Sequence, residues 1–110
     1  MKPTRTRLSD RRPTETIDVR HNGQRYHVSV GRFPDGSVSE IFITGPKSGS
    51  DLAAVIHDTA VALSIAAQYG VPLEEIRRAS MRNADGSPGS PIGAVLEKLM
   101  ESRDQKGSVR

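Results

Sequence analysis

Residues 15–44, ETIDVRHNGQRYHVSVGRFPDGSVSEIFIT, alternate apolar and polar side chains and contain two turn signals. Alternation with a period of two is typical of strands buried on one face, and short Gly-containing turns join such strands into hairpins. The stretch therefore predicts a three-stranded antiparallel meander, with strands over about residues 15–21, 24–32 and 38–44.

The first turn signal is the dipeptide Asn22-Gly23. Both central residues of a type I′ turn need positive φ, which Asn and Gly tolerate, so this dipeptide predicts a two-residue hairpin. In the resulting register, apolar pairs fall on one face and polar pairs on the other. The predicted pairs are Ile17 with Val28, Val19 with Tyr26, Thr16 with Ser29, Asp18 with His27, and Arg20 with Arg25.

The second turn signal is PDGS at residues 34–37, in which Pro presets φ and Gly leaves the turn. A four-residue loop here places Val30 opposite Ile41 and Val28 opposite Ile43. We therefore expect one apolar face to extend across all three strands.

Residues 51–69, DLAAVIHDTAVALSIAAQY, predict a long Ala-rich helix with Ser50 or Asp51 as N-cap and Gly70 as its stop. Because the helix is apolar over most of its circumference, we expect it to be the buried centre of an α+β fold. Its polar side chains form one narrow stripe, which we expect to face water: His57, Ser64 and Gln68.

Two shorter helices are predicted after the long one, over about residues 72–79 and 90–101. Pro72 suits the first position of the earlier helix, where i,i+3 and i,i+4 spacing pairs Glu74 with Arg77 and Arg78. Arg82 has no such partner in the sequence, so we consider it available to a phosphate or an acidic partner.

The chain has 110 residues, of which 35% are apolar and 26% charged, and this composition predicts a single folded domain. It contains no cysteine, which excludes disulfides, thiolate metal sites and cysteine nucleophiles. The longest strongly apolar run, residues 60–67, is far shorter than the roughly 20 residues of a membrane helix. The basic N-terminus is not followed by the apolar region of a secretory signal, so we expect a cytoplasmic protein.

Positive charge is concentrated at the N-terminus, where residues 1–12 carry five basic residues and one acidic one. The other 98 residues carry eleven basic and twelve acidic residues, so the remainder is nearly neutral. We predict a flexible basic arm at residues 1–13, a domain at 14–102 and a flexible tail at 103–110. Nucleic-acid binding is the alternative function, through the cations of the arm: Lys2, Arg5, Arg7, Arg11 and Arg12.

The sequence offers no catalytic constellation. The three histidines lack the paired spacing of metal ligands, and no nucleophile or P-loop motif is present, so we expect no metal, cofactor or catalytic residue. His27 is explained as the cross-strand partner of Asp18. We expect His57 and Asp58, which are neighbours in sequence, to point in different directions.

One element could bind an anion. Lys47, Ser48, Gly49 and Ser50 lead into the start of the long helix, where free N–H groups and the helix dipole attract a phosphate. We therefore predict a phosphate or nucleotide site at these four residues, with Arg82 as a further candidate. The alternative is an ordinary strand-to-helix connection with a serine or aspartate cap.

The sequence contains the segment GQRYHVSVGRFPDGSVSEIFI followed by KSGSDLAAVIHDTAVALSIAAQYGVPLEEI. The order of short motifs in these segments resembles the TSCPD domain that closes adenosylcobalamin-dependent (class II) ribonucleotide reductases, and the resemblance covers roughly residues 14–101. The naming motif, Thr-Ser-Cys-Pro-Asp, would fall near the last helix, where this chain has Gly-Ser-Pro-Ile at residues 89–92 and so keeps the proline but lacks the cysteine and the aspartate.

The resemblance implies a stand-alone, non-catalytic accessory or regulatory module in deoxyribonucleotide synthesis. It implies a reductase catalytic chain as partner and a nucleotide as ligand, and no chemistry by this polypeptide alone, because reduction needs a thiyl radical cysteine and a corrinoid-binding region. Independently of the resemblance, an exposed third strand and an Ala-rich helix favour a homodimer. A hydrolase is a third hypothesis, for which the sequence places no acid and base.

Overall fold

The structure is a computed structural model that describes residues 4–6, 8 and 14–108, the last seven of these by their backbone only. It has the predicted α+β architecture. One antiparallel sheet has the order β1-β2-β3, and three helices follow it in the chain. The bounds are β1 Thr14–His21, β2 Gln24–Arg32, β3 Val38–Thr44, α1 Asp51–Gln68, α2 Leu73–Ala79 and α3 Pro91–Ser108.

The predicted registers of both hairpins are confirmed. Asn22 and Gly23 have φ of 50° and 81°, as a two-residue turn of this type requires, and all five predicted pairs of β1 with β2 are present. The pairs of β2 with β3 at Val28 and Val30 are also as predicted. The register shifts next to Gly31, so that Ser39 is an extra residue on β3, a bulge that the alternation did not predict.

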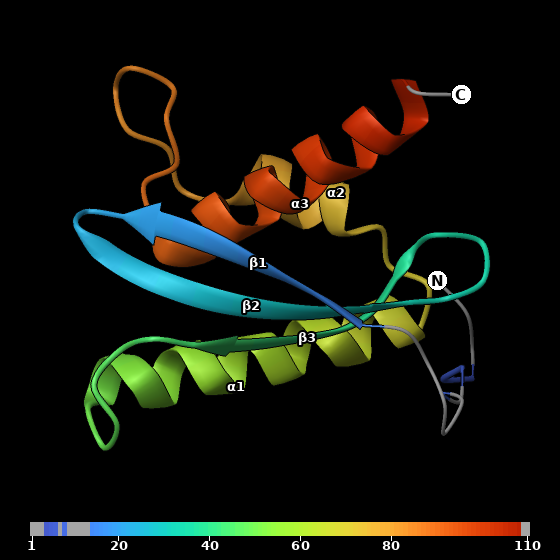
Figure 1. Cartoon of the computed structure of the whole chain (residues 1–110), viewed down its shortest axis with the longest axis horizontal. Helices are drawn as coiled ribbons and strands as arrows, with labels where there is room; N and C mark the ends of the chain where they lie inside the picture. Colours follow the sequence, from blue (N-terminus) through green and yellow to red (C-terminus); the bar gives the residue numbers. More distant parts are fainter. Residues whose placement is uncertain (1–3, 7, 9–13, 109–110) are drawn as a thin grey trace.

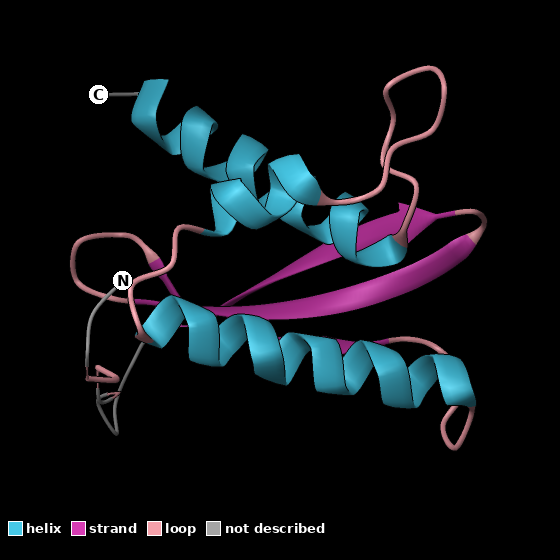
Figure 2. Cartoon of the chain, turned by 180° about the vertical axis from the view of Figure 1, so that it is seen from behind, coloured by secondary structure: helices cyan, strands magenta, loops and turns pink. Residues whose placement is uncertain are grey.

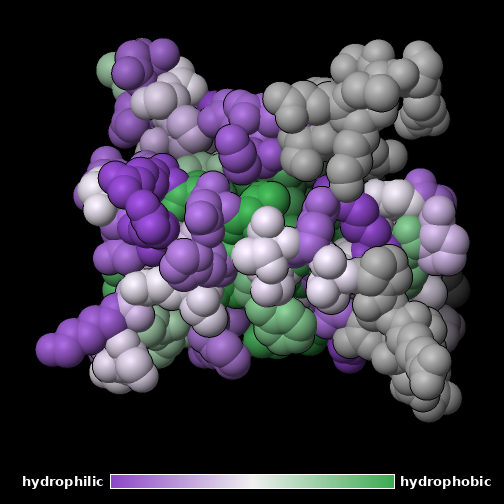
Figure 3. All heavy atoms as spheres, in the orientation of Figure 1, coloured by the Kyte–Doolittle hydropathy of each residue, from purple (hydrophilic) through white to green (hydrophobic). Residues whose placement is uncertain are grey.

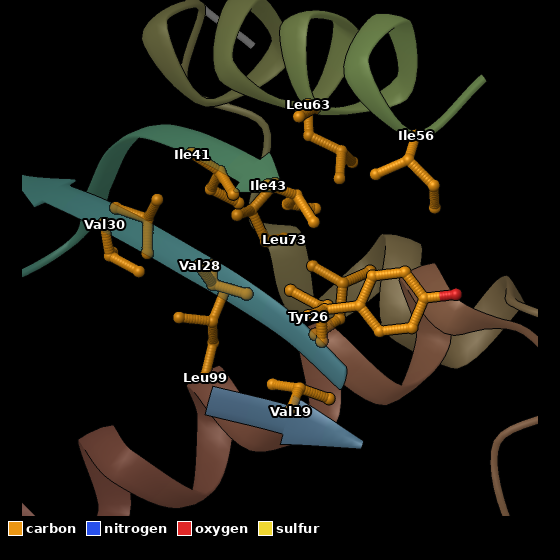
Figure 4. Packing of buried hydrophobic residues seen from close by; sticks show 14 of the residues in the cluster. Val19, Tyr26, Val28, Val30, Ile41, Ile43, Ile56, Leu63, Leu73 and Leu99 are labelled. Atoms are coloured by element: carbon orange, nitrogen blue, oxygen red, sulfur yellow. The ribbon is translucent and has the colours of Figure 1, made fainter. Parts of the chain in front are cut away.

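The helices flank the sheet along its two long sides. Figures 1 and 2 show α1 running beside β3 and α3 beside β1, with α2 packed against α3. Figure 4 shows Ile56 and Leu63 of α1 close to Ile41 and Ile43, and Leu99 of α3 close to Val28. One hydrophobic cluster therefore joins the sheet to all three helices, and its least exposed members are Tyr26, Val28, Val30, Ile41, Ile56, Val95, Leu96 and Leu99.

The expectation that α1 is the buried centre of the fold is wrong. Only one side of α1 is buried, at Ile56, Ala60, Leu63 and the C-terminal Ala67 and Gln68. Four large apolar side chains of the same helix are exposed: Leu52, Val55, Val61 and Ile65. Apolar composition around a helix does not show which sides are covered, and here the helix lies beside the outermost strand.

The polar stripe of α1 does not simply face water, as predicted, because two of its residues bind the edge of β3. The backbone N–H of Ile41 donates to Ser64 Oγ at 2.8 Å, and Gln68 Nε2 donates to the carbonyl of Ser39 at 2.9 Å. The expectation of an exposed third strand is therefore wrong at these positions, since α1 satisfies the edge groups that would otherwise pair with another strand. His57, the third residue of the stripe, is exposed.

The two later helices differ from the prediction at their ends. Pro72 is the N-cap of α2 and not its first helical residue, with an extended backbone at ψ 124°. The helix α3 continues to Ser108, beyond the predicted end at 101, into the segment for which we predicted a flexible tail. In the described part of the chain, no helix is both long and apolar enough to cross a membrane.

Candidate functional site

The predicted anion loop is an exposed turn closed by a helix cap. Ser50 Oγ accepts from the N–H of Ala53 at 3.1 Å and donates to the carbonyl of Lys47 at 2.6 Å. Ser50 is therefore the N-cap of α1, and the loop has the geometry of the ordinary connection. Lys47, Ser48 and Gly49 are exposed, and phosphate binding at these residues stays a prediction.

Arg82, which has no helix-spaced acidic partner in the sequence, has partners in the folded chain, and phosphate binding at Arg82 stays a prediction. Its Nη1 donates to the carbonyl of Gly86 at 2.9 Å and lies 3.7 Å from Glu97 Oε1. Helix spacing could not reveal these contacts, because Arg82 lies in a loop that folds back on itself and onto α3. In Figure 1 this loop, between α2 and α3, lies on the opposite side of the sheet from the loop between β3 and α1. The structure thus does not bring Arg82 together with Lys47.

Two histidines contact carboxylates. His27 Nδ1 lies 2.8 Å from Asp18 Oδ1, as the strand register predicted. His57 Nδ1 lies 3.1 Å from Asp58 Oδ1, so the prediction that these two side chains diverge is wrong. The side chains of His57 and Asp58 are 70% and 86% exposed, so water competes with this contact. Within the described residues, no group of three or more His, Asp or Glu side chains could hold a metal ion.

The predicted pairs of Glu74 on α2 are confirmed. Arg77 donates to the Glu74 carboxylate through Nε at 2.9 Å and Nη2 at 2.6 Å, and Arg78 Nε donates at 3.4 Å. The hydrogen bonds from Arg77, followed by its charge and by Arg78, lower the pKa of Glu74 from 4.5 to about 2. This carboxylate is thus engaged in holding the surface of its own helix.

Part of the N-terminal segment contacts the body of the domain, which the sequence did not predict. The backbone N–H of Thr6 donates to the carbonyl of Gln68 at 2.8 Å, and Arg5 Nε donates to Gln68 Oε1. Thr6 and Leu8 are half-buried, and the flexible arm at residues 1–13 stays a prediction. The other candidate nucleic-acid contacts lie outside the described residues, and their role stays a prediction: Lys2, Arg7, Arg11 and Arg12.

A groove of about 600 Å³ lies beside Thr6. Its walls come from the β2–β3 loop, the end of α1, the α1–α2 connection and α3, and most of its side chains are apolar. The lining residues are Thr6, Phe33, Pro34, Asp35, Ser37, Val38, Ala67, Gly70, Val71, Pro72, Leu73, Glu74 and Met100. A second cavity of about 400 Å³ lies between the β1–β2 hairpin and α3 and is lined by side chains of both charges.

Exposed apolar side chains lie on α1 and on the outer face of β3. Ser64 contacts the backbone of Ile41, and Phe42, the next residue, points to the opposite face of the sheet and is 54% exposed. Val61 and Ile65 flank Ser64 on the side of α1 away from Leu63, because successive helix residues are about 100° apart. Figure 3 shows hydrophobic atoms among hydrophilic ones in the lower part of the view, where Figure 1 has β3 and α1.

The fold and these surfaces define a small α+β domain with two apolar surfaces open to contact. The family model of the TSCPD domain matches residues 1–103, and the chain belongs to this family. The curated relatives include vitamin B12-dependent ribonucleotide reductases, and the family predicted from the sequence is confirmed.

Three of these relatives illustrate the similarity. The reductase of Rhodopirellula baltica is 45% identical over 75 residues, which are 68% of this chain and 7% of the relative. That of Agrobacterium fabrum is 39% identical over 71 residues, 64% of this chain and 6% of the relative. That of Streptantibioticus cattleyicolor is 36% identical over 73 residues, 66% and 12% of the two chains. The chain thus spans only a small part of these relatives, and no solved structure matches it.

Proposed function

We propose that this TSCPD domain is a non-catalytic accessory or regulatory module that binds the catalytic chain of a B12-dependent ribonucleotide reductase. The observation that carries the proposal is the 45% identity over 75 residues to such a reductase. In that reductase the matched segment is a small part of a much longer chain. We therefore infer that the surface of this domain can contact the rest of a reductase.

The surface formed by Phe42, Val61 and Ile65 supports a macromolecular partner. These three side chains are 54%, 41% and 37% exposed, the first on the outer face of β3 and the other two on α1. Burying large apolar side chains of this kind is a major source of binding free energy in protein interfaces. We therefore place the contact with the catalytic chain at this surface.

Binding to a purified B12-dependent reductase catalytic chain, followed by analytical ultracentrifugation and reductase activity, tests the proposal. We expect a complex and a change in activity or oligomeric state. The double variant Val61→Asp with Ile65→Asp weakens the complex, whereas Met81→Asp, at an apolar residue that is 72% exposed elsewhere, leaves it unchanged. No complex and no change in activity would contradict the function. A complex unaffected by the double variant would contradict only its location.

The regulatory part of the proposal includes nucleotide binding at residues 47–50. Calorimetry with ATP, dATP and the four ribonucleotides is expected to give micromolar binding that is lost in Lys47→Ala. Lys98→Ala is the matched control, because Lys98 is an exposed lysine on α3. Absence of binding to all these nucleotides would restrict the module to protein contacts, and equal loss in both variants would place the ligand elsewhere.

A further inference from the structure

Gln68 connects the N-terminal segment to the core of the domain. Its side chain is nearly inaccessible, at 3% exposure, and both ends of its amide are used. Nε2 donates to the carbonyl of Ser39, and Oε1 accepts from Arg5. Its backbone carbonyl, at the end of α1 where no helical partner exists, accepts from the N–H of Thr6. The N-terminal segment therefore donates hydrogen bonds to the backbone carbonyl and the side-chain oxygen of Gln68, at the end of α1.

Thr6 and Leu8 are both half-buried, whereas Thr4 and Arg5 are exposed. Thr6 itself lines the groove beside Phe33, Val38 and Met100. The segment is thus placed along an apolar wall by one backbone hydrogen bond and one charged side chain.

We propose that the end of α1 at Gln68, beside this groove, is a docking site for a basic segment, and that the N-terminal segment of this chain, through Arg5 and Thr6, occupies it in cis. The inference rests on these contacts and not on the proposed function. It assigns Arg5 to an intramolecular contact, and it makes the Gln68 site available to a similar segment only when the chain's own segment leaves.

Amide hydrogen exchange of the full chain tests the docking directly. We expect the Thr6 N–H to exchange at least about tenfold more slowly than an unstructured amide, since it is hydrogen-bonded in the docked state. Arg5→Glu removes the contact with Gln68 and abolishes the protection, whereas Arg25→Glu, at an exposed arginine of β2, preserves it. Exchange of Thr6 at the unstructured rate in the unchanged chain would overturn the proposal.

A labelled peptide of residues 1–8, MKPTRTRL, tests whether the Gln68 site accepts the segment in trans. The unchanged chain binds this peptide poorly, because its own segment competes at a high effective concentration. We expect the full-length Arg5→Glu variant to bind the peptide at least about tenfold more tightly in fluorescence anisotropy. Equal binding to both proteins, or equal binding of the peptide MKPTETRL, would show that the Gln68 site does not select this segment. Protection of Thr6 that rises with protein concentration would show docking between two copies and overturn docking in cis.

Discussion

Replacing Ser64 by alanine tests whether α1 stabilises the fold by covering the edge of β3. Ser64 Oγ accepts from the N–H of Ile41 at 2.8 Å, and its own hydrogen is within reach of the carbonyls of Ala60 at 2.9 Å and Ile41 at 3.2 Å. Ile41 is 1% exposed, so water cannot replace the lost acceptor without a rearrangement. The variant leaves a buried N–H without a partner.

The expected cost follows from two opposing effects. Leaving a buried donor unsatisfied costs about 1–3 kcal/mol. Alanine is a better helix former than serine by about 0.5 kcal/mol, which offsets part of this cost. We therefore expect Ser64→Ala to lower the free energy of unfolding by about 1–2 kcal/mol, which corresponds to a fall in Tm of about 4–8 °C for each kcal/mol in a domain of this size.

Urea denaturation monitored by circular dichroism measures this loss, and Thr59→Ala is its matched control. Thr59 lies on the same helix and donates to the carbonyl of Val55 at 2.7 Å, as Ser64 does to Ala60, but its hydroxyl makes no contact with β3. The two variants thus share the loss of a helix-internal hydrogen bond. Equal effects of the two substitutions on the urea midpoint would refute the argument that the edge contact is the source of the stability.

Two further predictions concern other local interactions. Because Arg77 lowers the pKa of Glu74 to about 2, the stabilising contribution of the Glu74 charge is complete above pH 4.5 and is lost as the pH falls through about 2. The difference in urea midpoint between the unchanged chain and Glu74→Gln should therefore shrink over this pH interval, and a constant difference would contradict the pairing. Gly45→Ala should prevent folding, because its φ is +137° and a Cβ would lie 2.3 Å from the carbonyl oxygen of Arg25. Gly36→Ala, at a glycine with φ +91° and open space around it, should lower the free energy of unfolding by only about 1–2 kcal/mol. Equal effects of Gly45→Ala and Gly36→Ala in thermal unfolding would contradict the proposed clash at Gly45.

The sheet could be predicted because its register depends on local turn chemistry. The positive φ of Asn22 and Gly23 closes the first hairpin, and alternation then assigns each side chain to a face. The position of α1 could not be predicted in this way. The apolar composition of α1 is compatible with burial on any side of the helix. The side that is buried depends on the position of β3 in the sheet.

The contacts of the candidate sites also divide into those that local geometry predicts and those that it does not. Glu74 and Arg77 are three residues apart on one helix, so their pairing follows from helix geometry alone. Arg5 and Gln68 are 63 residues apart, and their contact depends on the direction in which the chain enters β1 and leaves α1. A polar residue such as Gln68 in an otherwise apolar helix was the one available signal, and it is equally compatible with a residue that faces water.

The docked segment also bears on the nucleic-acid alternative, because both hypotheses use the same positive charge. Salt weakens phosphate contacts and docking at the Gln68 site alike, so salt dependence does not separate them. The sign of the change in nucleic-acid affinity caused by Arg5→Ala does separate the two hypotheses. If a free arm binds nucleic acid, the substitution removes one phosphate contact and lowers the affinity. If the arm is docked through Arg5, the substitution releases the remaining basic residues and raises the affinity. A filter-binding measurement with a short DNA duplex therefore distinguishes the two hypotheses by the direction of the change in affinity.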